Sequence, residues 1–199
     1  MDAVPDLEPA AARLRALLPS VGDDQLGQPT PCDGYVVADL LSHLVGLTVA
    51  FRDAARKQPS DGAPGEVPPL DVAWRDLLPA QLDELVIAWR EPGVGEGMTA
   101  AGGVELPGSV AAAVALDELV LHGWDLARAT GQPYDCDPTS AAVVHGFVSA
   151  VAAEGDEGPE GLFGRPVDVP SSAPLFDRCL GLSGRDPAWR PPDSANATP

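Results

Sequence analysis

The sequence has few basic residues and no long apolar run. Its 199 residues contain 12 Lys and Arg against 30 Asp and Glu, which gives a formal net charge of −18. Nonspecific binding to nucleic acid or to anionic lipid needs clustered positive charge, so we expect neither partner. No apolar run approaches the roughly 18 to 20 residues that a membrane-spanning helix needs. The 45% hydrophobic content excludes a wholly disordered acidic chain and predicts a soluble, folded protein.

A disulfide framework and a secretion signal are also missing. The three cysteines, Cys32, Cys136 and Cys179, are an odd number without C-x-x-C spacing, which predicts reduced thiols rather than disulfides or a structural zinc site. The first 20 residues have neither the basic start nor the continuous apolar core of a signal peptide. We therefore expect a cytoplasmic protein.

Helical periodicity is the main pattern that the sequence does show. Apolar residues recur at helical spacing in five segments, and a shorter sixth candidate follows near the C-terminus; the predicted helices span residues 6–19, 35–57, 71–89, 110–130, 137–153 and 174–182. Strands are scarce, apart from a possible short hairpin around residues 102–108. This pattern predicts an all-α fold, an antiparallel four-helix bundle with an additional helix.

Local signals mark where these helices begin and end. We expect Asp71 and Ser109 to cap the third and fourth helices, and Asp137 followed by Pro138 to begin the fifth. Gly131 is expected to end the fourth helix. Residues 1–154 are predicted to form the bundle, and residues 155–199 a C-terminal extension that packs on it and ends in a disordered tail.

The fourth predicted helix carries three polar residues on a partly apolar face. Glu118, His122 and Asp125 lie there, and the i, i+4 spacing of Glu118 and His122 places their side chains on successive turns. Burying a carboxylate and an imidazole without partners is costly, and a divalent cation compensates both. His43, on the apolar stripe of another helix, supplies a natural third ligand. Two nitrogens and one oxygen suit zinc, with nickel, iron or manganese as alternatives.

Each of these positions also has a plain structural interpretation. A histidine on an apolar face is often a hydrogen-bonded core residue, and an E-x-x-x-H pair is often a surface pair. Asp125 could hydrogen-bond the His122 ring or act as a base, or be a polar residue on the helix flank. Asp39 could orient His43 or be an exposed acid. Cys32 precedes a helix whose dipole could lower its pKa, although a small residue fixing the turn is the simpler interpretation.

Three sequence segments resemble one known family. The segment TPCDGYVVADLLSHLVG, at 30–46, resembles the first signature of the maleylpyruvate isomerase N-terminal domain group in the DinB-like superfamily, and ELVLHGWDLARATGQP, at 118–133, is similar to its second signature. The segment LGLSGRDPAWRPP, at 180–192, resembles the C-terminal end of short members that lack the isomerase's extra domain. Two departures are Tyr35 in place of a tryptophan and Val36 in place of a threonine.

The resemblance implies a fold, a metal site and a chemistry. Its members are four-helix bundles with an added helix, and their divalent-metal ligands fall on His43, Glu118 and His122. It implies that a low-molecular-weight thiol, chiefly mycothiol and in other branches bacillithiol or glutathione, is activated for isomerisation or S-transfer. Trp124 and Arg128 could then line the cleft or contact the thiol's carboxylate, or serve packing and solvation.

The sequence therefore predicts a metal-dependent enzyme that uses a thiol and a small electrophilic substrate. Two alternatives stay open: a noncatalytic bundle that binds a metal or a partner, and a metal-dependent hydrolase or lyase that uses activated water with Asp125 as base. A noncatalytic bundle predicts an occluded metal site without an adjoining pocket. The protein is expected to be a monomer or a homodimer.

Overall fold

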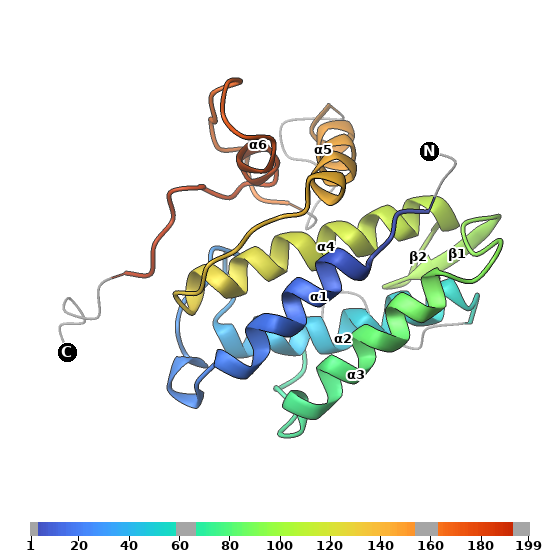
Figure 1. Cartoon of the computed structure of the whole chain (residues 1–199), viewed down its shortest axis with the longest axis horizontal. Helices are drawn as coiled ribbons and strands as arrows, with labels where there is room; N and C mark the ends of the chain where they lie inside the picture. The colour runs from blue at the N-terminus through green and yellow to red at the C-terminus, as the bar shows by residue number, and fades with distance from the viewer. Residues whose placement is uncertain (1–3, 59–66, 154–162, 193–199) are drawn as a thin grey trace.

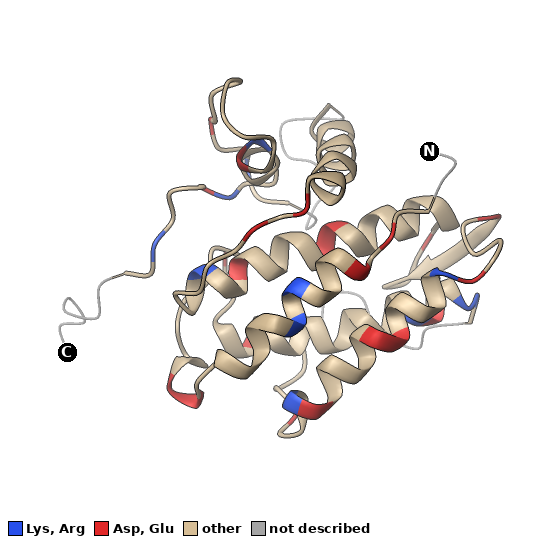
Figure 2. Cartoon of the chain, viewed as in Figure 1, with Lys and Arg blue, Asp and Glu red and all other residues tan. Residues whose placement is uncertain are grey.

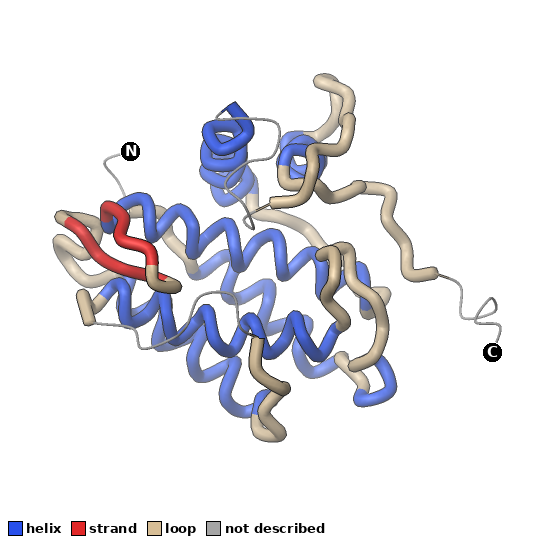
Figure 3. Tube along the Cα trace, turned by 180° about the vertical axis from the view of Figure 1, so that it is seen from behind, coloured by secondary structure: helices blue, strands red, loops and turns tan. Residues whose placement is uncertain are grey.

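The chain folds mostly into helices, as the periodicity predicts. The computed structural model describes residues 4–58, 67–153 and 163–192. Within these ranges the helices are α1 Glu8–Leu17, α2 Val37–Ala55, α3 Trp74–Trp89, α4 Gly108–Ala129, α5 Pro138–Ala153 and α6 Leu175–Leu182. The predicted hairpin is confirmed: β1 Met98–Ala101 pairs antiparallel with β2 Val104–Pro107. Figure 3 shows this hairpin at one end of the bundle.

Helices α1 to α4 form the bundle (Figure 1). Each of α1 and α2 packs against both α3 and α4. In Figure 1, α1 and α4 run in one direction and α2 and α3 in the other. The antiparallel bundle predicted from the sequence thus contains two parallel neighbouring pairs, α1 with α4 and α2 with α3, which helical periodicity alone does not reveal.

The predicted apolar stripes form the core. Each helix of the bundle contributes fully buried leucines: Leu14 from α1, Leu40 and Leu44 from α2, Leu78 from α3 and Leu119 from α4. Removing one such side chain from water stabilises the fold by about 1.5 to 3 kcal/mol. Because α4 contacts α1, α2 and α5, most of its residues are buried, and any polar side chain on it needs a partner inside the protein.

Two of the predicted helix boundaries are confirmed and two are displaced. Asp137 Oδ2 accepts a hydrogen bond from the Ser140 amide at 2.9 Å, and α5 begins at Pro138. Gly131, with φ of +70°, follows the end of α4. Neither remaining cap is formed: Asp71 accepts from the Ala73 amide and α3 begins three residues later, at Trp74, while Ser109 lies inside α4.

Helices α5 and α6 lie outside the four-helix core, on the far side of α4 from α2 and α3 (Figure 1). α5 packs against α4, and α6 packs against α5. Through these contacts the segment at 163–192 is held beside α4, where part of it reaches the site described below. The predicted disordered tail takes in residues 193–199, which lie outside the described residues, as does the predicted boundary at residue 154.

The acidic residues are distributed over several elements, and the basic ones are interspersed among them (Figure 2). The −18 charge of the whole chain therefore does not arise from a single acidic segment. Among the described residues, no helix combines the length and apolar character that crossing a membrane requires.

Candidate metal centre

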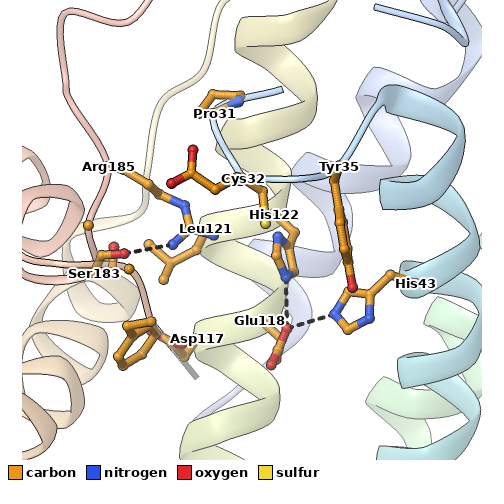
Figure 4. Close-up of a pocket in the computed structure, with 14 residues that line it drawn as sticks. Pro31, Cys32, Tyr35, His43, Asp117, Glu118, Leu121, His122, Ser183 and Arg185 are labelled. Atoms are coloured by element: carbon orange, nitrogen blue, oxygen red, sulfur yellow. Dashed lines mark hydrogen bonds and ion pairs between the residues drawn. The ribbon is translucent and has the colours of Figure 1, made fainter. Parts of the chain in front are cut away.

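Three predicted ligands meet between α2 and α4. Glu118 Oε2 lies 3.0 Å from His122 Nε2 and 3.3 Å from His43 Nε2, so both imidazoles converge on one carboxylate oxygen (Figure 4). His43 comes from α2, whereas Glu118 and His122 stand one turn apart on α4. The sequence spacing brings the α4 pair together, and the packing of α2 on α4 adds the third side chain.

Aromatic contacts fix the orientation of the imidazoles. The His43 and His122 rings meet edge to face, with centroids 4.9 Å apart and an interplanar angle of 86°. Tyr35, from the loop before α2, also meets His43 edge to face, with centroids 5.7 Å apart. The aromatic residue that departs from the family signature thus keeps a packing role against a predicted ligand.

Burial and hydrogen bonds act in opposite directions on the pKa values of Glu118 and His122. Burial opposes the ionisation of Glu118, but hydrogen bonds with His122 and His43 outweigh it, and its pKa lies well below the ordinary value. Burial also opposes protonation of His122, yet hydrogen bonds with Asp125 and Glu118 raise its pKa to about 9. Two carboxylates thus flank one imidazole, an arrangement that favours positive charge at this place.

The donor set fits a divalent metal ion. One ligand atom each from His43, Glu118 and His122 can be chosen so that all three lie within 4.8 Å of one another. Two imidazole nitrogens and one carboxylate oxygen are ligands that zinc takes at about 2.0 to 2.2 Å. A second group, Cys32, His122 and Asp125, meets the same spacing, but Arg185 already occupies both oxygens of Asp125. The first group therefore fits a metal better.

Asp125 orients His122. Its Oδ2 lies 2.9 Å from His122 Nδ1, on the ring edge opposite the one that faces Glu118. A carboxylate at Nδ1 holds the Nε2 edge toward the metal site, as in many metal-binding histidines. Asp125 is fully buried and does not line the pocket, so this placement favours the orienting role over the predicted role of a base that meets substrate.

Arg185 is a residue of this centre that sequence reasoning missed. Its Nε and Nη2 donate to Asp125 Oδ1 and Oδ2 at 2.9 and 2.8 Å. The end of α6 places it there: the Gly184 amide donates to Gly181 O and the Arg185 amide to Leu180 O, a Schellman motif with Gly184 at φ of +82°. The glycine after a short helix was the available signal, but nothing in the sequence indicated which element this turn faces.

A pocket of about 340 Å³ opens beside the three predicted ligands. Three parts of the chain line it: the loop before α2 with Cys32 and Tyr35, the two helices that carry the ligands, and the C-terminal segment with Phe163 and Arg185. A lowered pKa was one possibility for Cys32, but burial, followed by the charge of Asp125, raises the pKa of this thiol to about 12. The structure therefore opposes an activated nucleophile at Cys32.

The remaining candidates lie away from this pocket. Trp124 is buried in the core, and Arg128 lies over its ring, 5.5 Å from the centroid, and donates to Pro187 O. Neither lines the pocket, so their predicted part in cofactor binding stays a prediction without support from this geometry. Asp39 neither orients His43 nor stands fully exposed; it accepts a hydrogen bond from the Val36 amide and caps α2.

The fold and the site together define a helix-bundle protein with a candidate two-histidine, one-carboxylate metal centre. Residues 7–127 match the model of the mycothiol maleylpyruvate isomerase N-terminal domain, and the chain belongs to this family. The match includes the whole first signature segment, 30–46, and the second, which begins at Glu118, as far as residue 127. The resemblance inferred from those segments is therefore confirmed.

Known relatives and solved structures agree with this assignment. Uncharacterized proteins from two strains of Mycobacterium tuberculosis, CDC 1551 and H37Rv, are each 33% identical over 173 residues, which is 85% of this chain and 90% of theirs. The crystal structure of a mycothiol-dependent maleylpyruvate isomerase has a TM-score of 0.64 at 16% identity, covering 97% of this chain and 92% of that one. The crystal structure of a histidine-to-alanine mutant of such an isomerase has a TM-score of 0.59 at 18% identity, covering 84% of this chain and 75% of that one. These structures confirm the predicted fold.

Proposed function

We propose that this protein is a metal-dependent enzyme in which His43, Glu118 and His122 hold a divalent ion, most suitably zinc, and which uses a thiol such as mycothiol. The observation that carries the proposal is the convergence of two Nε2 atoms on Glu118 Oε2 at the wall of a pocket. The bound ion would supply a Lewis acid that favours the thiolate of a coordinated thiol at neutral pH. The reaction is S-transfer to, or isomerisation of, a small electrophile.

The protein's own residues position these partners. Asp125 and Arg185 hold the His122 ring in place, and Tyr35 packs on the His43 ring. Leu121 and Phe163 add apolar surface to the pocket, which limits the access of water to the reacting sulfur. The adjoining pocket favours this proposal over a noncatalytic bundle, for which an occluded site was expected. The placement of Asp125 gives no support to the hydrolase alternative.

Metal analysis of protein purified without a histidine tag tests the first half of this proposal. We expect close to one equivalent of metal in the wild type and its loss in His122→Ala. His145→Ala is the matched control, because His145 lies on α5, outside the pocket, beside Arg178. Metal content that is substoichiometric and unaffected by His122→Ala would contradict the proposal.

Thiol dependence tests the second half. The metal-loaded wild type is incubated with a model electrophile in the presence and absence of mycothiol, and product is followed by mass spectrometry. We expect turnover only with the thiol, with an S-conjugate indicating S-transfer and an isomer of unchanged mass indicating isomerisation. Turnover that proceeds equally without a thiol would instead indicate activated water.

A further inference from the structure

Asp117 is a buried acid, and one of its carboxyl oxygens has no hydrogen-bond partner within the part of the chain that the structure describes. It precedes Glu118 on α4 and is only 2% exposed, and its Oδ1 has no partner among the described residues. The other buried acid of α4 differs: Asp125 has both oxygens engaged by Arg185, and one also by His122. An unpaired polar group in the interior costs folding free energy. Asp117 therefore lowers the stability of the protein, and no hydrogen bond from another described residue to its Oδ1 offsets this cost.

The same side chain lines the pocket beside the predicted metal ligands. Neighbouring residues on a helix are about 100° apart around its axis, so Asp117 and Glu118 face different sides of α4. Figure 4 shows Glu118 directed at the two histidines and Asp117 on the side of Ser183 and the C-terminal segment. A ligand in this pocket therefore meets the predicted metal ligands on one side and the Asp117 carboxyl group on the other.

The charges around the pocket indicate what kind of group Asp117 receives. Arg185 is the one Lys or Arg that lines it among the described residues, and each of its three side-chain nitrogens already donates, two to Asp125 and one to Ser183 O. A ligand carboxylate at this side would lie beside the Asp117 carboxyl group, and the charge of the one arginine there is already paired with Asp125. A hydroxyl or amino group would instead supply the hydrogen-bond donor that Asp117 lacks.

We propose that Asp117 is a specificity-determining residue, which accepts a hydrogen bond from a hydroxyl group of the thiol bound in this pocket. The inference rests on the proposed function, since it takes a thiol as the ligand. Mycothiol suits it because its cysteine is attached to a hydroxyl-rich glucosaminyl inositol, whereas N-acetylcysteine offers the same sulfur without those hydroxyl groups. Asp117 thus distinguishes thiols by the part of the molecule remote from sulfur.

The experiment compares two thiols and four metal-loaded proteins, the wild type and three variants, by calorimetry in the absence of any electrophile. Asp117→Ala removes the acceptor, Asp117→Asn keeps one acceptor oxygen without charge, and Glu105→Gln makes the same acid-to-amide change on the exposed hairpin. We expect the wild type to bind mycothiol more tightly than N-acetylcysteine. In Asp117→Ala the Kd for mycothiol should rise at least about tenfold while the Kd for N-acetylcysteine changes little. Asp117→Asn should recover part of the loss, and Glu105→Gln should match the wild type.

Metal content and unfolding temperature separate this role from a structural one. Because Asp117 is not one of the predicted metal ligands, both variants should keep the wild-type metal content, and Asp117→Ala, which removes the unpaired oxygen, should unfold at the same or a higher temperature. Equal weakening of both thiols, or unchanged affinity in both variants, would overturn the inference while leaving the proposed function intact. Loss of metal together with a lower unfolding temperature in Asp117→Asn would likewise overturn it. A wild type that binds neither thiol would overturn the proposed function and this inference together.

Discussion

Arg185 holds Asp125 through two parallel hydrogen bonds, 2.9 Å from Nε to Oδ1 and 2.8 Å from Nη2 to Oδ2. Both side chains are buried, and Asp125 in turn meets Nδ1 of His122. A residue that follows α6 is thereby connected to a predicted metal ligand on α4. The C-terminal segment is for this reason a structural part of the site, and changes in it are expected to reach the metal.

Replacing Arg185 should destabilise the protein strongly. Arg185→Leu leaves the Asp125 carboxylate buried without its cationic partner, which typically costs about 3 to 5 kcal/mol. Urea denaturation followed by circular dichroism measures the change in the free energy of unfolding. Arg190→Leu is the control, because Arg190 is exposed and donates to the neighbouring carbonyls of Ala188 and Trp189. Similar losses in the free energy of unfolding of the two variants would show that the Arg185–Asp125 ion pair does not contribute more to stability than an exposed arginine does.

Asp125→Asn should weaken metal binding more than it weakens the fold. The amide keeps the size of the side chain but removes the charge that holds the His122 ring, and such changes typically cost about 10- to 100-fold in metal affinity. Competition with a chromogenic chelator gives the zinc Kd. Asp39→Asn serves as the comparison, since Asp39 caps α2 four residues before His43 and is expected to affect stability but not zinc affinity. An unchanged Kd in Asp125→Asn would contradict the orienting role.

Gly184→Ala should disturb the wall of the pocket. Gly184 has φ of +82°, and a Cβ there would lie 2.7 Å from the backbone of Gly164. The positive φ and the close approach of Gly164 both disfavour a side chain at this position. We therefore expect the free energy of unfolding to fall by at least about 1 kcal/mol. Gly146→Ala on α5, where a Cβ meets nothing within 4 Å, should instead gain up to about 1 kcal/mol from helix propensity. The two melting curves should therefore shift in opposite directions.

The buried thiols should make the protein less stable in alkali. Burial raises the pKa of Cys136 and of Cys179 from 9.0 to about 12. Between these values the unfolded chain releases thiol protons that the folded chain keeps, so the free energy of unfolding falls as pH rises above about 9. Urea denaturation at a series of pH values measures the slope. A double Cys136→Ala, Cys179→Ala variant should reduce the slope, leaving the part that comes from Cys32, and a slope identical to that of the wild type would contradict this origin.

Periodicity sufficed to find the helices. The stripes that contain Leu14, Leu40 and Leu78 are buried in the structure as predicted, because a helix at the edge of a core exposes one face and buries the other. The directions of the helices could not be obtained in this way. Whether α3 runs parallel or antiparallel to α2 depends on how the connection between them crosses the bundle, and a loop's composition does not encode its path.

The predicted metal ligands were accessible to sequence reasoning for two different reasons. Glu118 and His122 are four residues apart, and helical geometry alone makes them neighbours. His43 was included because it lies on an apolar stripe and in a family signature, and the packing of α2 on α4 places it 3.3 Å from Glu118. No sequence pattern indicated that Asp117 is buried, because an acid next to a candidate ligand resembles an ordinary solvated residue.

The sequence by itself therefore determined the helical class, the burial of each helical stripe and the local pairing on α4, since these follow from interactions between residues a few positions apart. Only the tertiary structure decided that Arg185 supports Asp125 and that one oxygen of Asp117, beside the pocket, has no partner among the described residues. Both depend on contacts of α4 with α5 and the C-terminal segment, which join residues up to 60 positions apart. Such contacts are selected by the packing of whole elements, and a local pattern carries no information about them.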